Sequence, residues 1–380
     1  MGARRVEKLR GPLDATLQAV PSKSVTHRAL VTAALADGET LLLGPLDADD
    51  TQITREGLVA LGIDITSEPG RWTVRGRGGR IRGAGAIALG GSGTSMRLLT
   101  AVAALGSAPS RLDGAARLRE RPLGDLLTAL RSLGGEIHAD PGTAGIPLLA
   151  GGGAIRGGRV NLPGRRSSQF ASALLLIAPR LPGGIDLRID PPAVSLPYVE
   201  LTAAVLSAFD VSVTRLSERH WRVNPGAFSG REYRIEGDHS SASYFLAAAA
   251  VCGGRVRLAG LDPCSKQADA RLVILLEELG CNVDAACGQL EVRASGEIPV
   301  FDIDLSDAPD LVPTVAVLGL FADGPCVIRG VTHLRYKESD RLEMLARNLR
   351  ALGRDATALE DRLVIGRPPP CLGGGRIATA

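Results

Sequence analysis

The sequence has 380 residues, of which 45% are hydrophobic and 22% charged, and its formal net charge is +3. This length allows two large domains or three small ones, and the small net charge excludes a protein that binds nucleic acid or a membrane through a strong surface field. The first ten residues are charged and lack an apolar stretch, which argues against a secretory signal, and no apolar run is long enough to span a bilayer.

The first predicted element is a helix within residues 21–38, PSKSVTHRALVTAALADG, which Gly38 ends. Ser24 and Arg28 are four residues apart, so they share a face near the helix start, and Lys23 flanks them. Free N–H groups, a hydroxyl and two cations at a helix start suit a carboxylate or a phosphate. A solvated basic helix start explains the same residues without a ligand.

A second helix is predicted within residues 88–105, ALGGSGTSMRLLTAVAAL, after a glycine-rich turn. Gly93 and the glycines before it allow a ligand to approach the backbone closely. Thr94 or Ser95 can cap this helix, and Arg97 lies just inside it. No Gly-Lys-Ser/Thr follows, so the segment is not a Walker loop, and a plain turn explains it equally well.

Further helix starts also carry polar groups. They occur in the segments RRSSQFASALLLIAP (165–179), EGDHSSASYFLAAAAVCGG (236–254) and LRYKESDRLEMLARNLRALG (334–353). In the last segment Lys337 and Glu338 share a face with Arg341, which is also the pattern of a surface ion-pair ladder. Asp310 precedes an apolar helix, where a carboxylate could serve only as a cap. Together these groups indicate a site for a substrate with more than one anionic group.

A repeat runs through the chain. Its copies are LVALGIDI from Leu58, LRSLGGEI from Leu130, LSAFDVSV from Leu206, LEELGCNV from Leu276 and LRALGRDA from Leu349, at steps of 72, 76, 70 and 73 residues. Each copy is typical of a helix end, a turn and a strand, although Leu-x-x-Leu-Gly is also a common helix ending. The even spacing favours an α/β protein of duplicated units. Since the fifth copy begins close to Ala380, we expect the fifth unit to be incomplete or a sixth to lie beyond it.

Several motifs resemble, in the same order, those of the 5-enolpyruvylshikimate-3-phosphate synthase family, and most closely its archaeal branch. They are PSKSVTHRAL, GGSGTSMRLLTA, RLRERPLGDLLTAL, SSQFASALLLIAP, SLPYVELT, GDHSSASYFLAAAA, PDLVPTVAVL and HLRYKESDRL. The resemblance covers the chain from about Leu17 to Ala380. It implies two domains of repeated βαβαββ units, one formed by residues 1–22 and 237–380 and the other by residues 23–236, with the active site in the cleft between them.

The activity that this resemblance implies is transfer of the enolpyruvyl group of phosphoenolpyruvate to the 5-hydroxyl of shikimate 3-phosphate, with release of phosphate. The reaction belongs to chorismate and aromatic amino acid biosynthesis. It proceeds by addition and elimination without a metal or an organic cofactor. The resemblance further implies a cytoplasmic monomer that binds these two small molecules and neither nucleic acid nor membrane.

The resemblance also implies the site residues. The catalytic residues would be Lys23, Asp310 and Glu338. Shikimate 3-phosphate would be bound by Lys23, Ser24, Arg28, Ser167, Ser168, Gln169, Ser195, Tyr198, Asp310 and Lys337. Phosphoenolpyruvate would be bound by Lys23, Gly93, Arg121, Gln169, Glu338 and Arg341. Asp310 would be the base for the 5-hydroxyl and Glu338 the acid for C3, while Lys23 would take part in proton transfer.

The end of the sequence departs from the family pattern. Residues 373–380, GGGRIATA, resemble the segment just before the family motif GDHR-[IM]-AMA, and neither that motif nor the later phosphoenolpyruvate-binding lysine follows. We therefore expect a chain truncated at its C-terminus, with its last unit missing or incomplete. Two alternatives stay open. The chain could bind shikimate 3-phosphate without efficient turnover, or it could be the sister transferase that acts on UDP-N-acetylglucosamine.

Overall fold

The computed structural model describes residues 5–7, 9–83, 85–286, 288–368 and 375–377, and one supersecondary motif recurs along them. In each copy two parallel strands are neighbours, and the inner one is followed by a helix and a hairpin whose second strand pairs antiparallel with it. In one sheet the outer parallel strand, Glu232–Arg234, comes last in the chain. The five four-stranded sheets of the described chain all have this order of neighbouring strands. The predicted α/β fold of βαβαββ units is therefore confirmed.

Residues 21–236 and 333–340 form one compact unit, called unit A here, which contains three of these sheets. In sheet order their strands are β13 (Glu232–Arg234), β2 (Asp37–Leu43), β4 (Arg71–Arg77) and β3 (Asp64–Glu68); β5 (Ala86–Ala88), β6 (Ser110–Asp113), β8 (Leu148–Ala150) and β7 (Ile137–Ala139); and β11 (Val213–Ser217), β12 (His220–Val223), β10 (Ile185–Asp190) and β9 (Gly158–Pro163).

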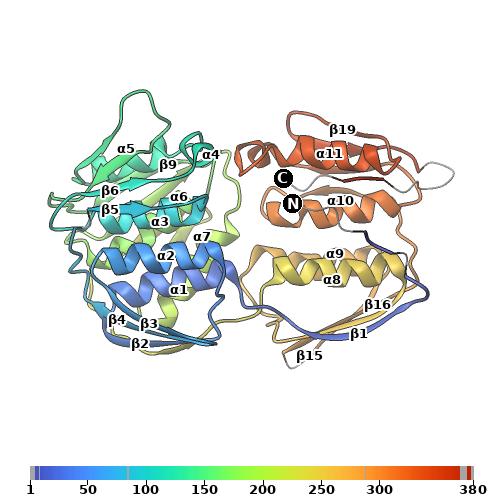
Figure 1. Ribbon diagram of the computed structural model, residues 1–380, viewed down its shortest axis with the longest axis horizontal. Coiled ribbons are helices and arrows are strands. Elements are labelled where there is room, and N and C mark those ends of the chain that lie inside the picture. The colour runs from blue at the N-terminus through green and yellow to red at the C-terminus, as the bar shows by residue number, and fades with distance from the viewer. Residues whose placement is uncertain (1–4, 8, 84, 287, 369–374, 378–380) are drawn as a thin grey trace. The chain divides into compact units, whose positions relative to one another are not determined.

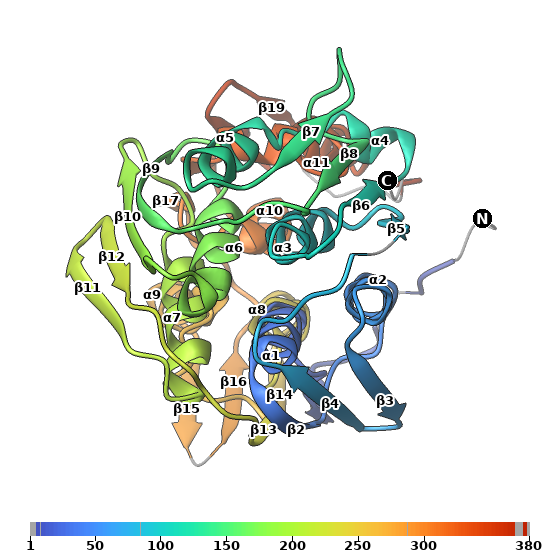
Figure 2. The same ribbon diagram turned by 90° about the vertical axis from the view of Figure 1, so that its left-hand side faces the viewer.

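The helices of unit A are α1 (Lys23–Leu35), α2 (Asp49–Ala60), α3 (Gly93–Ala103), α4 (Ala116–Arg119), α5 (Gly124–Ser132), α6 (Gln169–Ile177) and α7 (Pro197–Ala208). Helix α1 is buried from Val25 to Leu35, and α6 is buried from Phe170 to Ile177. A helix that is buried on all sides must lie inside the domain. Figure 2 shows α1, α3 and α6 inside, with the sheets around them.

Residues 1–20, 237–332 and 341–380 form the second compact unit, unit B. In sheet order its strands are β1 (Leu13–Gln18), β14 (Gly254–Ala259), β16 (Gln289–Ala294) and β15 (Asn282–Ala286); and β17 (Asp302–Asp304), β18 (Cys326–Arg329), β20 (Arg362–Ile365) and β19 (Ala356–Ala358). Its helices are α8 (His239–Cys252), α9 (Leu272–Glu278), α10 (Val312–Phe321) and α11 (Arg341–Ala351). Figure 1 shows both helix pairs lying on these sheets.

The boundaries of the units differ from the predicted domains at residues 21–22, which group with unit A, and in one longer segment. Residues 333–340, which carry Lys337 and Glu338, group with unit A, because Arg117 of α4 binds the backbone of this segment. The fifth repeat has its full set of strands and helices, so of the two alternatives expected from the repeat spacing, an incomplete fifth unit is wrong. Most of the segment 373–380 lies outside the described residues.

No described helix is both long and apolar enough to cross a membrane.

The repeated sequence ends five helices in the same way. In every copy the first leucine accepts a backbone hydrogen bond from the residue five positions later, as in Leu58 from Ile63 and Leu276 from Cys281. The residue before this donor has a positive φ, for example 91° at Gly62 and 86° at Gly280. This is the Schellman ending, in which a left-handed residue favours glycine. The third copy has Asp210 there, with φ 63°, which explains why its sequence reads Phe-Asp.

Replacing Gly280 by alanine should therefore lower the stability of unit B by about 1–2 kcal/mol, the cost of a left-handed non-glycine residue. A Cβ at Gly280 would meet nothing within 4 Å, so no steric clash contributes. Chemical denaturation of the full chain measures the change. The control is Gly11→Ala, where a Cβ is equally unhindered and φ is ordinary. Equal effects of the two substitutions would contradict the Schellman argument.

Candidate active site

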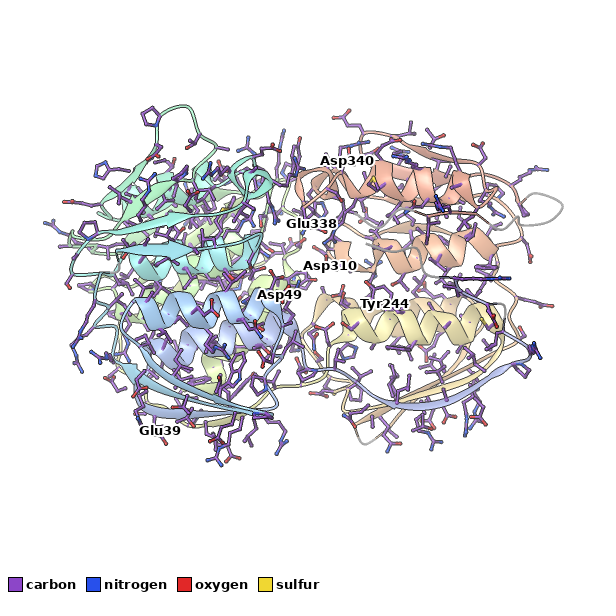
Figure 3. All side chains as sticks on the ribbon, in the orientation of Figure 1. Glu39, Asp49, Tyr244, Asp310, Glu338 and Asp340 are labelled. Atoms are coloured by element: carbon purple, nitrogen blue, oxygen red, sulfur yellow. The ribbon has the colours of Figure 1, made fainter. Side chains whose placement is uncertain are left out.

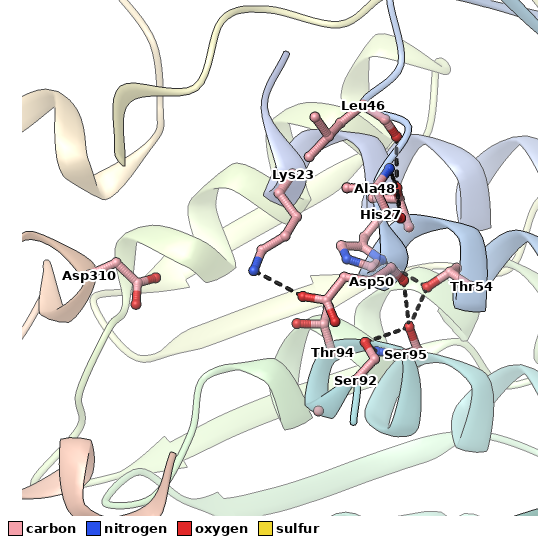
Figure 4. A network of polar contacts seen from close by, with 12 residues as sticks. Lys23, His27, Leu46, Ala48, Asp50, Thr54, Ser92, Thr94, Ser95 and Asp310 are labelled. Carbon is pink, nitrogen blue, oxygen red and sulfur yellow. Dashed lines mark hydrogen bonds and ion pairs between the residues drawn. The ribbon is translucent and has the colours of Figure 1, made fainter. Parts of the chain in front are cut away.

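Lys23 begins α1, and Ser22 caps this helix by accepting a hydrogen bond from the Val25 N–H. The Lys23 ammonium lies 3.0 Å from the carboxylate of Asp50 on α2, as Figure 4 shows. Burial alone would raise the pKa of Asp50, but the charge of Lys23 and hydrogen bonds from Lys23 and Ser92 hold it below its usual value. Because the Lys23 side chain is 49% exposed, its ammonium can also reach a ligand.

Arg28 is only 3% exposed, and neutral groups surround it. Its Nε donates to Thr202 Oγ1 at 2.8 Å, its Nη1 to the Ser24 carbonyl at 2.9 Å, and its Nη2 to Ser172 Oγ and the Tyr198 carbonyl, both at 3.2 Å. Burial lowers the pKa of Arg28 to about 10, and no described carboxylate counters this effect. One of its five N–H donors remains for a ligand. A buried cation balanced only by neutral groups is suited to an anion.

The start of α3 meets the start of α6. The guanidinium of Arg121 lies against Gly93, where a Cβ would overlap it, so a larger residue would require Arg121 to move. The carboxamide of Gln169 is held at both ends: its Oε1 accepts from Arg97 Nη1 at 3.1 Å, and its Nε2 donates to Thr94 Oγ1 at 3.2 Å. The structure thus brings the predicted residues Gly93, Arg121 and Gln169 together. It adds Arg97, which the sequence placed in the helix without a role.

Three predicted serines lie on neighbouring loops. Strands β9 and β10 are parallel neighbours, and a 3.1 Å hydrogen bond from the Val194 N–H to the Gly164 carbonyl joins the loops that follow them. Ser167 and Ser168 belong to the first loop and Ser195 to the second. Ser195 has φ 58°, a conformation that L-residues avoid. Strain of this kind gathers at ligand-binding sites, which supports the prediction for Ser195.

Lys337 and Glu338 lie in an irregular segment just before α11. Arg117 donates from its Nη2 to the Lys337 carbonyl and from its Nε to the Glu338 carbonyl, both at 3.2 Å. These bonds fix the backbone of the segment and leave the orientation of the two side chains to other contacts. Glu338 is exposed, whereas Lys337 is half-buried.

Asp310 and Arg341, the two predicted residues of unit B, form an ion pair. Asp310 lies in a short 3-10 turn (Pro309–Leu311) before α10, and its Oδ1 accepts from Arg341 Nη1 at 2.8 Å. Figure 3 labels Asp310 together with Tyr244 of α8. Burial raises the pKa of Tyr244, while the charge of Arg341 opposes this rise. A carboxylate, a guanidinium and a phenol therefore share one end of unit B.

A chain of hydroxyl groups lies behind Lys23 (Figure 4). His27 Nδ1 is 2.8 Å from Thr54 Oγ1, which is 2.7 Å from Ser95 Oγ, and Ser95 is in turn 2.7 Å from Ser92 Oγ. Ser95 also donates to the backbone carbonyl of Asp50 at 3.0 Å. This network ties α1, α2 and the α3 start together, so it fixes the partner of Lys23. Spacing could not predict this network, because its members come from three helices; the cap of α3 is Ser92, and not Thr94 or Ser95 as the sequence suggested.

The arrangement in unit A can bind anions from several sides. It combines two buried guanidinium groups, the N-terminus of a capped helix, serines on adjacent loops and an ammonium. Helix N-termini and guanidinium groups are the usual partners of phosphate and carboxylate. Among the described residues no three His, Cys, Asp or Glu side chains converge as metal ligands would.

Comparison with known proteins gives consistent results. The family model described as "EPSP synthase (3-phosphoshikimate 1-carboxyvinyltransferase)" matches residues 8–380. The 3-phosphoshikimate 1-carboxyvinyltransferase of Methanoculleus marisnigri is 43% identical over 94% of this chain and 86% of that protein. The enzyme of the same name from Methanosphaerula palustris is 44% identical over 96% of this chain and 86% of that protein. A solved EPSP synthase from Acinetobacter baumannii superposes with a TM-score of 0.75 at 26% identity, covering 96% of this chain and 85% of that one.

The buried His27 should make the fold sensitive to acid. Burial lowers its pKa from 6.5 to about 3, so the folded protein keeps the imidazole neutral while the unfolded chain takes up a proton below pH 6.5. Stability should therefore fall as the pH falls below about 6.5, by at most about 1.4 kcal/mol per pH unit for this one proton.

The variant His27→Asn offers an oxygen to Thr54 and does not titrate, so its stability should depend less steeply on pH over this range. Denaturant unfolding of both proteins, from about pH 7 to about pH 4.5, measures the difference. Parallel stability curves for the two proteins would show that His27 is not the source.

Proposed function

This chain belongs to the EPSP synthase (3-phosphoshikimate 1-carboxyvinyltransferase) family, and from that premise we propose how its residues divide the reaction among themselves. The function is transfer of the enolpyruvyl group of phosphoenolpyruvate to the 5-hydroxyl of shikimate 3-phosphate, with release of phosphate. It is a step of aromatic amino acid biosynthesis. The family model and the named relatives do not favour the alternative acceptor UDP-N-acetylglucosamine.

For shikimate 3-phosphate, we propose that unit A provides the binding groups. The observation that carries this proposal is Arg28, a buried guanidinium that no described carboxylate neutralises and that keeps a donor for the shikimate carboxylate. Ser24 shares its helix end, and Tyr198 supplies a carbonyl that holds it. The 3-phosphate would be bound by the serines of the adjacent loops, Ser167, Ser168 and Ser195.

For phosphoenolpyruvate, the proposal assigns the groups around the α3 start. Gly93 leaves its backbone open beside the Arg121 guanidinium, and the fixed carboxamide of Gln169 lies next to both. Lys23 and Glu338 would contact the same substrate from α1 and from the segment before α11. Arg341 of unit B would be a second cation for it. Since a guanidinium has five donors, Arg341 can bind Asp310 and still contact an anion.

The chemistry requires a proton at C3 of phosphoenolpyruvate and the loss of the proton on the 5-hydroxyl. The hydroxyl oxygen then bonds to C2, and in the second step a C3 proton and phosphate leave. We propose Asp310 as the base for the hydroxyl, Lys337 as a group that orients it, and Glu338 with Lys23 as the groups that exchange protons with C3. Such groups contribute about 10²–10⁴-fold each when correctly placed. Asp310 acts on the acceptor only if units A and B serve the same substrate pair, which is part of the proposal.

We further propose that the protein works as a cytoplasmic monomer without nucleic-acid or membrane partners. Gel filtration with light scattering and cell fractionation would test these two properties independently of the reaction. A stable dimer or a membrane-bound fraction would refute them.

Turnover should depend on Asp310 while binding does not. Asp310→Asn should lower phosphate release from phosphoenolpyruvate and shikimate 3-phosphate by about 10²-fold or more. The dissociation constant of shikimate 3-phosphate, measured by calorimetry, should change only a few-fold. Asp302→Asn is the matched control, because Asp302 is another aspartate of unit B with an arginine partner, Arg329. Release driven by UDP-N-acetylglucosamine in place of shikimate 3-phosphate would overturn the proposed acceptor.

Substitutions of Ser195 should change the affinity for shikimate 3-phosphate without lowering the stability of the protein. Glycine relieves the strain of φ 58° at some cost in chain entropy, so Ser195→Gly should leave the melting temperature unchanged or slightly higher. The same variant loses the hydroxyl, and the affinity for shikimate 3-phosphate should fall about ten-fold or more, since a hydrogen bond to a charged group contributes about 1.5–3 kcal/mol. Ser195→Ala should lose the same affinity and keep the strain. Wild-type affinity in both variants would remove Ser195 from the phosphate site.

A further inference from the structure

Arg97 has an unusual set of hydrogen-bond partners. It lies one turn inside α3, is 3% exposed, and its Nη1 donates to the Gly93 carbonyl at 2.8 Å and to Gln169 Oε1 at 3.1 Å. Its Nη2 donates to the Pro122 carbonyl at 3.4 Å. The guanidinium thus joins the start of α3, the start of α6 and the loop between α4 and α5.

Each of these three segments carries a group proposed for phosphoenolpyruvate. Arg97 donates directly to two of these groups, the Gly93 carbonyl and Gln169 Oε1. For the third group, Arg121, it donates to the carbonyl of the next residue, Pro122. The geometry of the three groups therefore depends on one planar guanidinium, which fixes directions as an ammonium cannot.

The bond to Gln169 also decides how its carboxamide is oriented. A carboxamide that lies between two donors can present either end, because its oxygen and nitrogen have the same shape. Arg97 is a donor only, so it holds the oxygen, and the amide nitrogen then faces Thr94, 3.2 Å from its Oγ1. With Arg97 in place, the Gln169 amide nitrogen keeps a second N–H besides the one that faces Thr94.

The charge of Arg97 is not balanced by the protein. No described carboxylate pairs with it, its Nε is buried without a hydrogen-bond partner, and the neighbouring charge is the like-charged Arg121. Burial, and then Arg121, lower its pKa to about 9, so it remains a cation at neutral pH. The Phe170 ring, 5.5 Å from its Cζ, adds a weak attraction. A buried cation beside a half-buried one is stabilised when an anion binds next to them.

We propose that Arg97 is the positioning residue of the phosphoenolpyruvate half of the site, acting through Gly93, Gln169 and the Arg121 loop. This inference rests on the proposed function, because it takes these three groups as ligands of phosphoenolpyruvate. Arg97 itself needs no contact with the substrate. Misplacing ligand groups by about 1 Å can cost about 10²-fold in rate, so the loss of one shared anchor should be large and selective.

Arg180 provides a matched control. It is a largely buried arginine of the same unit that donates to the carbonyls of Leu35 and Phe228 and lies over the Phe228 ring at 4.3 Å. Its partner Leu35 is at the far end of α1 from Lys23, about 18 Å along the helix. Both arginines bind backbone carbonyls and lie over a phenylalanine ring, but Arg180 also pairs with the Asp37 carboxylate at 2.9 Å. Arg180→Lys therefore controls for the loss of buried guanidinium contacts at the far end of α1, and Arg97→Lys tests the near end.

The experiment measures two affinities in the full chain by calorimetry. One is the dissociation constant of shikimate 3-phosphate. The other is that of phosphoenolpyruvate in the presence of an acceptor analogue without the 5-hydroxyl, which prevents turnover. For Arg97→Lys and Arg97→Gln we expect phosphoenolpyruvate to bind at least about ten-fold more weakly, equivalent to about 1.4 kcal/mol, while shikimate 3-phosphate changes less than about three-fold. Arg180→Lys should alter neither constant.

Different outcomes identify different errors. If Arg97→Lys binds phosphoenolpyruvate as the wild type does, the charge alone suffices and the positioning role is wrong. If Gln169→Ala in the wild-type background leaves phosphoenolpyruvate binding unchanged, the ligand assignment of the proposed function fails instead. In the double variant Arg97→Lys/Gln169→Ala the two effects should be less than additive, because Arg97 acts partly through Gln169. Full additivity would overturn that part of the inference. A cooperative thermal unfolding transition close to that of the wild type shows that each variant is folded.

Discussion

Two guanidinium groups enclosed among the helices of unit A, Arg28 and Arg97, set the main constraint on this part of the molecule. Each is 3% exposed, and no described carboxylate neutralises either one. Removing a cation from water costs several kcal/mol even after the protein relaxes, so the surroundings must supply acceptors. They do so with carbonyl and hydroxyl oxygens, which attract a cation without cancelling its charge. The positive charge therefore remains available to an anionic substrate.

The repeated unit explains how so many anion-binding groups come to one place. In each βαβαββ copy a helix precedes the inner strand of the parallel pair: α3 and α6 each follow the outer parallel strand, β5 or β9, whereas α1 precedes β2, whose parallel partner β13 comes later in the chain. Within unit A these helices are α1, α3 and α6, and the groups that the site uses lie in their first turns or in the loops before them. Duplicating one small unit thus multiplies a single favourable feature, the free N–H groups of a helix start. Local substitutions then differentiate the copies, as Arg28 and Arg97 show.

The repeats and most site residues could be predicted from the sequence, because each depends on neighbouring residues in the chain. The repeats were visible because a left-handed helix ending needs glycine at Gly62, Gly134, Gly280 and Gly353, a requirement that a single residue expresses. The pairing of Gly93 with Arg121 or of Gln169 with Arg97 depends on helices distant in sequence, so spacing alone could not find it. The segment 333–340 was assigned to the wrong unit for the same reason: Arg117, more than two hundred residues earlier, determines where it packs.

Lysine is rare in this chain, and its positions differ in kind from those of the buried arginines. The chain has 44 lysines and arginines, and lysine occurs only at positions 8, 23, 266 and 337. Arginine stays charged when buried, which suits Arg28 and Arg97, but a guanidinium hardly releases a proton near neutral pH. An ammonium can exchange one, and its pKa responds to its surroundings. Lys23 lies at the exposed end of α1 with Asp50 as its partner, and the network through Ser92, Ser95 and Thr54 holds that partner in place. Permanent charge is thus kept inside unit A, while the group proposed to move protons lies where a substrate can reach it.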